Sequence, residues 1–324
     1  MTRTWKPALA AMAAIALPMA LGAFGEAGEK IRVAFSPQTD TAHVRLATRL
    51  MQGVEVEAVP IKTFVEAQVA LQTGDIQFGT LGVNSIATLA DAGVKTVKII
   101  AGYVTGTHVL SARKGIQLKT WKDLEGKTVG SITGSMAHFR LLMSLKHHGV
   151  DLNRVKIVHY PPGPPILAAM REGIVDAVMV WDPMAAQIKL AGTGDYSGLD
   201  VTDNPAGPAT GVIGVNADFE RKHPDIVQKF VDALIEATKR LKANREEWIR
   251  LAIEATGASR EIIEESFKHM DLNYLIFYDK AAGLTRAAKP LGMTKTDVSG
   301  AEDTIIEWKY LEKATGKSRK DLRI

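Results

Sequence analysis

The sequence predicts an α/β protein of two lobes with a ligand cleft between them, and two observations carry this expectation. Strand-like apolar runs alternate with helical patterns between Lys30 and Val215, an order typical of sheets flanked by helices. A short internal repeat indicates that the chain contains two units built alike. We therefore expect each lobe to hold a mainly parallel sheet with helices on its faces.

Hydrophobic periodicity places the elements of the first unit. Leu46 and Leu50 share one stripe of a helix, and a short apolar run follows Gly74 and Asp75. The expected elements are a strand at 30–35, a helix at 42–51, a strand at 54–59, a helix at 62–73, a strand at 76–79 and a helix from Gly82 to Ala90. Strands at 97–101 and 109–113 follow, with 102–107 as a segment that crosses between the units.

A second strand, turn and helix run from Gly130 to Gly149. Ser135 lies where an N-cap belongs, Gly134 allows the turn without a Cβ clash, and Gly149 can end the helix in a left-handed conformation. A helix that begins in this way directs unpaired N–H groups and the positive end of its dipole at one point, where a small anion could bind. The alternative is that Ser135 only caps its own helix.

The repeat relates these two units. Residues 42–46 (AHVRL) are echoed by 137–141 (AHFRL), and residues 71–74 (LQTG) by 170–173 (MREG), in the same order and at nearly the same offset. Two echoes in order indicate two lobes of the same construction. The expected division of the chain is 28–105 and 209–324 for lobe 1, and 106–208 for lobe 2.

The remaining segments are less regular. The proline-rich turn at 160–165 ends in a proline that suits the first turn of a helix, and 210–215 is expected to be a strand that returns to lobe 1. The rest is expected to be helical, with a long helix from Pro224 that extends to about Ala255, helices at 259–270 and 303–313, and a loose polar end at 316–324.

Residues 1–27 have the pattern of a secretory signal peptide. Arg3 and Lys6 precede an uncharged, alanine-rich run from Ala8 to Phe24 that is too short for a membrane span. The chain contains no cysteine, which excludes disulfides, thiol nucleophiles, cysteine–zinc sites and a lipid-modified cysteine at the cleavage point. We therefore expect a soluble periplasmic protein.

Composition also narrows the classes of partner. The 324 residues include 40 basic and 36 acidic ones, and no basic cluster indicates nucleic-acid binding. His147 and His148 are adjacent on a helix and do not face one site, so we expect them at the surface rather than around a metal. We expect neither a metal, nor a cofactor, nor nucleic acid.

The loops after the strands are where a ligand is expected, because ligands collect at the carboxyl ends of strands in open α/β sheets. These loops are 36–39 and 82–85 in the first lobe, and 133–138 and 181–183 in the second. Two such lobes facing each other would form a hinged cleft lined by helix N-termini.

Four motifs occur in order along the chain: GSMAH at 134–138 within strand, turn and helix, Pro161-Pro162 after a strand, WDP at 181–183, and KHPD at 222–225 opening a helix. Together they resemble the nitrate/sulfonate/taurine substrate-binding proteins of ABC importers, most closely the alkanesulfonate and taurine branch. The resemblance implies a type II periplasmic-binding-protein fold and a monomeric, non-enzymatic receptor. Such a receptor closes around a small organic anion and delivers it to a membrane permease driven by a separate ATPase.

The resemblance also implies which residues bind the ligand. They are Gln38, Thr39, Asn84, Ser85, Ser135, Met136, His138, Trp181, Asp182 and Thr210. Ser135 and the N–H groups after it would hold anionic oxygens, and Trp181 would wall the organic part. Gly211 stands where the taurine branch tends to place an acid that could meet an amine, so taurine itself is in doubt.

Several alternatives stay open. Asp182 can cap the next helix instead of meeting a ligand, Trp181 can be a core residue, and His138, which matches His43 in the repeat, can make a structural hydrogen bond. The ligand could also be nitrate, a carboxylate, a sulfate ester or a heterocycle. The rival classes of function are a periplasmic sensor or an enzyme of the same fold.

Overall fold

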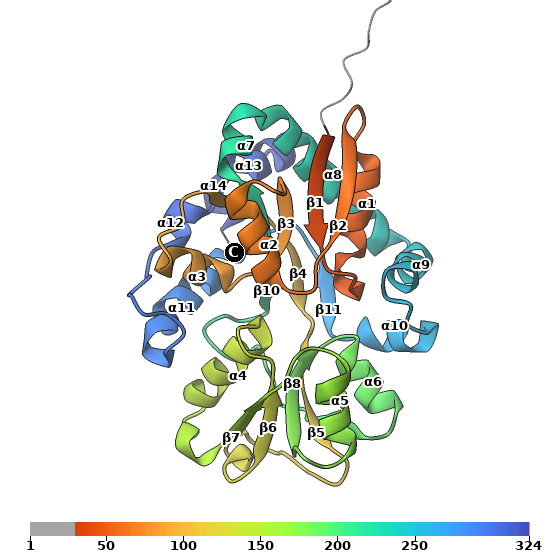
Figure 1. The fold of residues 1–324 in the computed structure, drawn as a ribbon, viewed down its shortest axis with the longest axis vertical. Helices are drawn as coiled ribbons and strands as arrows, with labels where there is room; N and C mark the ends of the chain where they lie inside the picture. The colour runs from red at the N-terminus through yellow and green to blue at the C-terminus, as the bar shows by residue number, and fades with distance from the viewer. Residues whose placement is uncertain (1–29, 324) are drawn as a thin grey trace, which may run out of the picture.

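The computed structural model describes residues 30–323, so the expected signal peptide at 1–27 lies outside the described residues. Two sheets, each flanked by helices, lie one above the other along the long axis of the molecule (Figure 1). The first lobe is built on a six-stranded sheet and the second on a five-stranded sheet. The two-lobed α/β class predicted from the sequence is confirmed.

The sheet of the first lobe has the strand order β11-β4-β10-β3-β1-β2. Its strands are β1 (Lys30–Phe35), β2 (Glu55–Pro60), β3 (Phe78–Gly82), β4 (Val97–Gly106), β10 (Ala209–Asn216) and β11 (Met270–Leu272). β1 pairs in parallel with β2 and β3, whereas β10 runs antiparallel to both β3 and β4.

The sheet of the second lobe has the order β7-β6-β8-β5-β9. Its strands are β5 (His108–Arg113), β6 (Thr128–Ser131), β7 (Lys156–His159), β8 (Ala177–Trp181) and β9 (Gly194–Tyr196). β6 pairs in parallel with β7 and β8, and β5 is antiparallel to β8 and β9. Both sheets are thus mixed rather than mainly parallel, because the strand that arrives from the other lobe, β10 in the first sheet and β5 in the second, runs antiparallel to its neighbours.

The helices divide unequally between the lobes (Figure 1). The first lobe carries α1 (Ala42–Leu50), α2 (Phe64–Thr73), α3 (Ser85–Asp91), α7 (Ala217–Lys222), α8 (Pro224–Ala243), α9 (Arg245–Thr256), α10 (Arg260–Ser266), α11 (Tyr278–Ala288), α12 (Glu302–Ile305), α13 (Lys309–Thr315) and α14 (Arg319–Leu322). The second lobe carries α4 (Met136–His147), α5 (Pro164–Arg171) and α6 (Met184–Leu190).

The internal repeat is confirmed by the topology. The order β1-α1-β2-α2-β3 recurs as β6-α4-β7-α5-β8, with β1 and β6 each paired between the other two strands. The first pair of echoed segments lies at the start of α1 and α4, and the second pair lies at the end of α2 and α5. The second pair finishes on Gly74 and Gly173, which have φ of 81° and 72°. A left-handed residue at a helix end favours glycine, which explains why both echoes finish on one.

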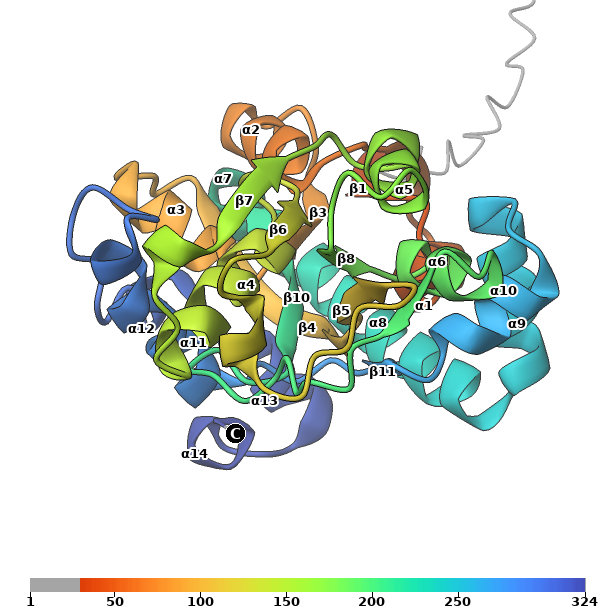
Figure 2. The ribbon, with the colours of Figure 1, turned by 90° about the horizontal axis from the view of Figure 1, so that it is seen from below.

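Helices cover both faces of the second sheet, as the view from below shows (Figure 2). Ala177 and Met179 of β8 pack in one cluster with residues of α4, while the alternate residues Val178 and Val180 pack with α5 and α6. Successive side chains of a strand point to opposite faces, so a continuous apolar run such as 177–180 fits a strand buried on both sides.

The first lobe has the larger core. The ring of Phe78 on β3 stacks on Phe230 of α8 with centroids 4.3 Å apart, and Phe219 of α7 meets Phe78 edge-on at 5.7 Å. The helical pattern from Pro224 does not continue to Ala255 as one helix, because Asn244 interrupts it and its side chain accepts a hydrogen bond from Glu247 N at 3.1 Å. Asparagine favours such N-caps, so α9 begins anew there.

Three expectations near the C-terminus are wrong in detail. The helix expected at 303–313 is divided into α12 and α13, because Ile306 bridges to Ile99 of β4. The helix expected at 259–270 ends at Ser266, and the chain then enters β11. The end expected to be loose contains α14, whose Leu322 is fully buried. Among residues 30–323 no helix is long and apolar enough to cross a membrane.

A buried arginine connects α4 to both segments that cross between the lobes. Arg140 is fully buried, and its guanidinium donates to Gly207 O, to Ala209 O at 2.6 Å and to Val201 O at 3.2 Å, on the segment that returns to the first lobe. Its Nε donates to His108 Nδ1 at 3.3 Å, at the start of β5. Burial lowers the Arg140 pKa to about 10, so the side chain remains a cation at neutral pH.

We predict that Arg140→Met destabilises the protein by about 3 kcal/mol, because buried carbonyls left without a donor cost about 1–3 kcal/mol each. Arg45, at the equivalent position of the repeat, is the matched control: it is partly exposed and 3.6 Å from Glu254. Arg45→Met should cost less than about 1 kcal/mol. Denaturant unfolding followed by circular dichroism measures both, and equal losses would contradict the role of Arg140.

Candidate functional site

A cavity of about 360 Å³ lies between the lobes. It is lined by Ser36, Gln38 and Asp40 after β1, by Lys62, Thr63, Phe64 and Val65 after β2, by Thr107 and His108 at the crossing, by Ile132, Thr133, Gly134, Ser135 and Met136 after β6, by Tyr160, Pro161 and Pro162 after β7, and by Trp181 and Thr210. Most of these residues follow the carboxyl end of a strand, which is where the sequence predicts a ligand.

The walls of the cavity are largely apolar. Phe64, Tyr160 and Trp181 contribute aromatic rings, and Pro161 and Pro162 lie beside Tyr160 in the same loop. A mostly apolar cavity with a few polar groups is typical of sites for small organic ligands. The positions of the few polar groups therefore determine which part of a ligand can bind at each end of the cavity.

The N-terminus of α4 reaches the cavity from the second lobe. Ser135 is its N-cap: the Oγ accepts from His138 N at 3.1 Å and donates to Ile132 O at 2.6 Å. The capping role that the sequence left as an alternative is therefore observed. The backbone N–H of Met136, in the first turn, has no acceptor within its helix, and Met136 lines the cavity.

The N-terminus of α2 reaches the same cavity from the first lobe. Thr63 is the N-cap: its Oγ1 accepts from Glu66 N at 3.2 Å, and Glu66 Oε2 accepts from Lys62 N, just before the cap, at 2.8 Å. Lys62, Thr63 and Phe64 all line the cavity, so a lysine and a helix start lie together there. Two helix N-termini and one cation make this part of the cavity favourable for an anion.

Asp40 brings the opposite charge to the cavity wall. Its side chain lies in the turn Thr39–Thr41 before α1, it is 3% exposed, and its Oδ1 has no hydrogen-bond partner. Burial, together with a smaller effect of Asp182, raises the Asp40 pKa to about 7, although a hydrogen bond from its own backbone N–H opposes the rise. Ser36, three per cent exposed on the same loop, also has an Oγ without a partner.

The groups behind Asp40 do not supply a positive charge. Burial lowers the His43 pKa to about 3, so this imidazole is neutral, and its ring lies 6.0 Å from that of Tyr103. Tyr103 is fully buried and its hydroxyl has no partner. The Tyr103 ring occupies the space beside Gly211 of β10, where an added Cβ would lie 2.3 Å from ring carbons.

The crossing from β4 to β5 forms another part of the wall. Thr107 has a φ of 65°, an unfavourable conformation for a residue with a branched side chain. It is held by hydrogen bonds from Thr107 N to His269 O at 2.6 Å and from Asp182 N to Thr107 O at 3.1 Å. These contacts fix the crossing segment at the cavity wall.

Five of the ten predicted ligand residues line the cavity: Gln38, Ser135, Met136, Trp181 and Thr210. Thr210 Oγ1 donates to Gly106 O at 2.6 Å, so its hydroxyl already binds the crossing segment. Of the alternatives for Trp181, the structure shows a partly exposed ring at the cavity wall rather than a fully buried one.

The other five predicted residues, Thr39, Asn84, Ser85, His138 and Asp182, lie outside the lining. Thr39 and Ser85 are buried. Asn84 Nδ2 donates to Gly134 O at 3.5 Å, a contact from one lobe to the other. His138 Nδ1 lies 3.1 Å from Ser131 Oγ, the structural hydrogen bond left open as an alternative, and burial lowers its pKa to about 4.

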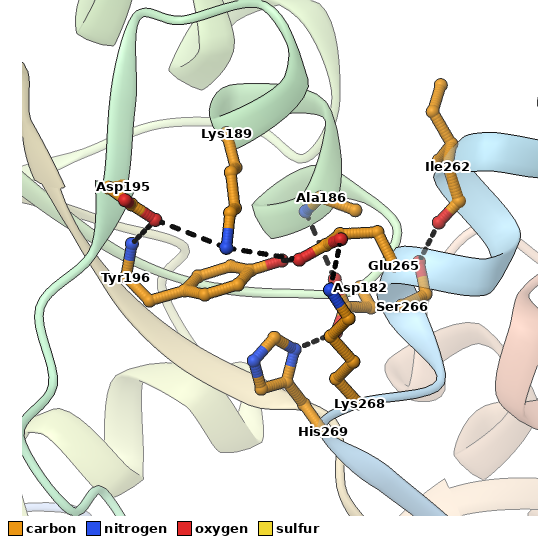
Figure 3. A network of polar contacts seen from close by, with 10 residues as sticks. All are labelled: Asp182, Ala186, Lys189, Asp195, Tyr196, Ile262, Glu265, Ser266, Lys268 and His269. Atoms are coloured by element: carbon orange, nitrogen blue, oxygen red, sulfur yellow. Dashed lines mark hydrogen bonds and ion pairs between the residues drawn. The ribbon is translucent and has the colours of Figure 1, made fainter.

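Asp182 is held in a polar network that links α6, β9 and the α10–β11 segment (Figure 3). Its Oδ1 accepts from Ala186 N at 3.1 Å in α6, and its Oδ2 lies 3.0 Å from His269 Nδ1. Burial raises the Asp182 pKa, while the His269 contact opposes this. The capping alternative therefore describes Asp182. Tyr196 OH donates to Glu265 at 3.1 Å in the same network, which links β9 of the second lobe to α10.

The cavity wall also contains four residues that were not predicted from the sequence: Asp40, Lys62, Phe64 and Tyr160. The prediction considered the loops after β1, β3, β6 and β8, and omitted those after β2 and β7, although the same rule applies to every parallel strand. For Asp40 a signal was present, because it is a charged residue directly after the chosen loop 36–39. Within residues 30–323 no group of three histidine or acidic side chains is placed to hold a metal ion.

We predict that Asp40 makes the stability of the ligand-free protein depend on pH. Its folded pKa of about 7 exceeds the ordinary value of 3.8, so the folded state binds this proton more tightly than the unfolded chain. The stabilisation is complete below a pH of about 3.8 and is lost as the pH rises through about 7. Across this pH window the free energy of unfolding of the wild type should therefore fall by on the order of a few kcal/mol more than that of Asp40→Asn.

Denaturant titrations at several pH values measure this difference. The titratable groups that interact with Asp40 are Asp182 and Tyr103, and both remain in the variant. Asp75→Asn, at an exposed site, is the matched control and should follow the wild-type curve. Identical slopes for Asp40→Asn and the wild type would rule out the buried titration.

Comparison with known proteins agrees with the two-lobed architecture. The chain is 29% identical over 241 residues to the taurine-binding periplasmic protein of Escherichia coli (strain K12), a match that covers 72% of each chain. The alkanesulfonate-binding protein SsuA from Xanthomonas axonopodis pv. citri bound to MOPS has a similar fold, with a TM-score of 0.71, 18% identity and coverage of 86% of this chain and 98% of that one.

A second solved structure, the periplasmic aliphatic sulphonate binding protein SsuA from Escherichia coli, matches with a TM-score of 0.73 and 19% identity over 86% of this chain and 92% of that one. The fold is therefore that of the periplasmic binding proteins, as the resemblance in sequence implied. Residues 51–248 match the family model described as NMT1/THI5 like. The chain belongs to the NMT1/THI5-like family.

Proposed function

We propose that this chain is the periplasmic substrate-binding component of an ABC importer and that it captures a small organic sulfonate between its lobes. The observation that carries this proposal is the cavity of about 360 Å³ on which the N-termini of α2 and α4 converge from opposite lobes. Lobe 1 would comprise 28–105 and 209–324, and lobe 2 would comprise 106–208. The relatives named above, which bind taurine or sulfonates, support this class of ligand.

The chemistry of the cavity favours an anion that carries an organic part. Lys62 and the first turns of α2 and α4 offer N–H donors and positive charge to an anionic head group. Phe64, Tyr160 and Trp181 offer apolar surface that nitrate or sulfate would not use. We therefore place an organic sulfonate ahead of an inorganic anion.

In this proposal the protein binds and releases its ligand without transforming it. A monomer exported to the periplasm would present the closed, loaded state to a membrane permease, and a separate ATPase would drive transport. The ligand favours closure because it contacts both lobes only when they are together. Asn84 Nδ2 already donates to Gly134 O across the cleft at 3.5 Å, a contact that the closed state would keep.

We predict that an alkanesulfonate raises the thermal stability of the purified protein. At about a hundred times its dissociation constant, a ligand adds roughly 2.7 kcal/mol to the unfolding free energy. The panel includes taurine, ethanesulfonate, an aromatic sulfonate, a sulfate ester, nitrate and acetate. Lys62→Gln should reduce the shift, whereas Lys229→Gln, at an exposed site on α8, should not. A panel in which no sulfonate shifts the transition would refute the proposal.

We also predict that the ligand closes the lobes. Small-angle scattering should give a smaller radius of gyration with a saturating sulfonate than without it, because both lobes contribute to the cavity wall. Acetate at the same concentration serves as the control for ionic strength. An unchanged radius with a sulfonate that demonstrably binds would argue against a hinge motion on binding.

A further inference from the structure

Three aromatic rings lie at the wall of the cavity, and they come from opposite lobes. Phe64 begins α2 in the first lobe, whereas Tyr160 follows β7 and Trp181 ends β8 in the second. All three side chains are partly exposed where they line the cavity. A ligand held between the lobes therefore meets aromatic surface from both of them.

Each ring is supported from behind. The Phe64 ring lies over Gly82 of β3, where an added Cβ would be 3.3 Å from Phe64 Cδ2. The Tyr160 ring lies in the same way over Gly130 of β6, where an added Cβ would be 3.4 Å from Tyr160 Cε2. Trp181 packs against both apolar clusters of the second lobe. Rings that rest on strand backbone and core lose little freedom when a ligand binds, so this wall is preorganised.

The cavity is larger than a short sulfonate requires. Its volume is about 360 Å³, whereas an apolar cavity of about 150 Å³ is sufficient to bind benzene in another protein. The tails of taurine and ethanesulfonate are short two-carbon chains. They would leave much of the apolar wall without contact atoms, and such gaps forfeit dispersion energy. A tail of the size of an aromatic ring fits the cavity better.

The wall does not favour a cationic tail. Among the lining residues, which all lie within the described part of the chain, Asp40 supplies the only carboxylate, and its Oδ1 is buried. Lys62 lines the same cavity and would repel an ammonium group. An amine on the tail would thus be removed from water without an open counter-charge, which is unfavourable. The tail that suits this wall is apolar.

We propose that the ligand is an arenesulfonate, whose ring binds between Phe64 of the first lobe and Tyr160 and Trp181 of the second. This inference rests on the proposed function for the sulfonate group, which Lys62 and the first turns of α2 and α4 would hold. Aromatic rings attract one another in offset-stacked and edge-to-face arrangements, beyond the effect of burying their area. The three side chains thereby determine specificity for an aromatic tail over a short aliphatic one.

Isothermal titration of the purified protein at neutral pH with benzenesulfonate, cyclohexanesulfonate, ethanesulfonate and taurine tests the inference. Benzenesulfonate should bind more tightly than ethanesulfonate by about thirtyfold or more, because its tail buries more carbon atoms. It should bind more tightly than cyclohexanesulfonate by about threefold or more, because the two tails have equal carbon counts and only one is aromatic. Taurine should bind no more tightly than ethanesulfonate.

A matched pair of variants tests the ring of the first lobe. Phe64 and Phe277 are both partly buried and pack against the same apolar core, but of the two only Phe64 lines the cavity. Phe64→Leu should reduce the preference for benzenesulfonate over ethanesulfonate by about threefold or more, because the contact between rings is lost. Phe277→Leu should keep the wild-type preference.

The outcomes separate this inference from the proposed function. If ethanesulfonate, taurine or cyclohexanesulfonate binds as tightly as benzenesulfonate, the aromatic site is overturned and sulfonate binding stands. An unchanged preference in Phe64→Leu, or an equal loss in Phe277→Leu, would also overturn it. If the wild type binds none of the four sulfonates, the proposed function fails and this inference fails with it. The wild-type comparison requires no variant, so it decides the question even if Phe64→Leu does not fold.

Discussion

The arrangement of the two lobes depends on the buried guanidinium of Arg140. It binds carbonyls of the segment that returns to the first lobe and the imidazole of His108, where the chain first crosses. Burial and the adjacent guanidinium keep the His108 pKa well below its usual range, so the ring accepts the hydrogen bond as a neutral group. Arg140 lies in α4 and His108 at the cavity wall, so this contact fixes the helix start against the crossing segment.

Local chemistry made much of the fold predictable, and long-range contacts account for what was missed. The strand, turn and helix around Ser135 were predicted because a serine cap and flanking glycines act on their own neighbours. The direction of β5 and β10 was not predicted, because the alternation of apolar residues is the same in parallel and antiparallel strands. The break at Ile306 likewise depends on Ile99, far away in the sequence.

Two aspartates at the candidate site also depend on long-range contacts that the sequence does not reveal. Asp40 and Asp182 both follow a strand of the repeat, and both are buried. Asp182 accepts from Ala186 N of the following helix α6 and lies 3.0 Å from His269 of the distant α10–β11 segment, whereas Asp40 has an oxygen with no partner among the described residues. Only the packing of distant segments distinguishes a fully paired carboxylate from one with an unpaired oxygen. The sequence analysis named Asp182 as a ligand residue, with capping as its alternative, and did not name Asp40, which lines the cavity.

The close approach of Tyr103 to Gly211 has a consequence for how this site can change. Any side chain at position 211 would collide with the Tyr103 ring, so an acid cannot be added there while the tyrosine remains. The two positions are therefore epistatic: relocating the negative charge from the turn before α1 to β10 requires a double substitution. An engineer who altered either position alone would obtain a steric clash or an empty space, and no new selectivity.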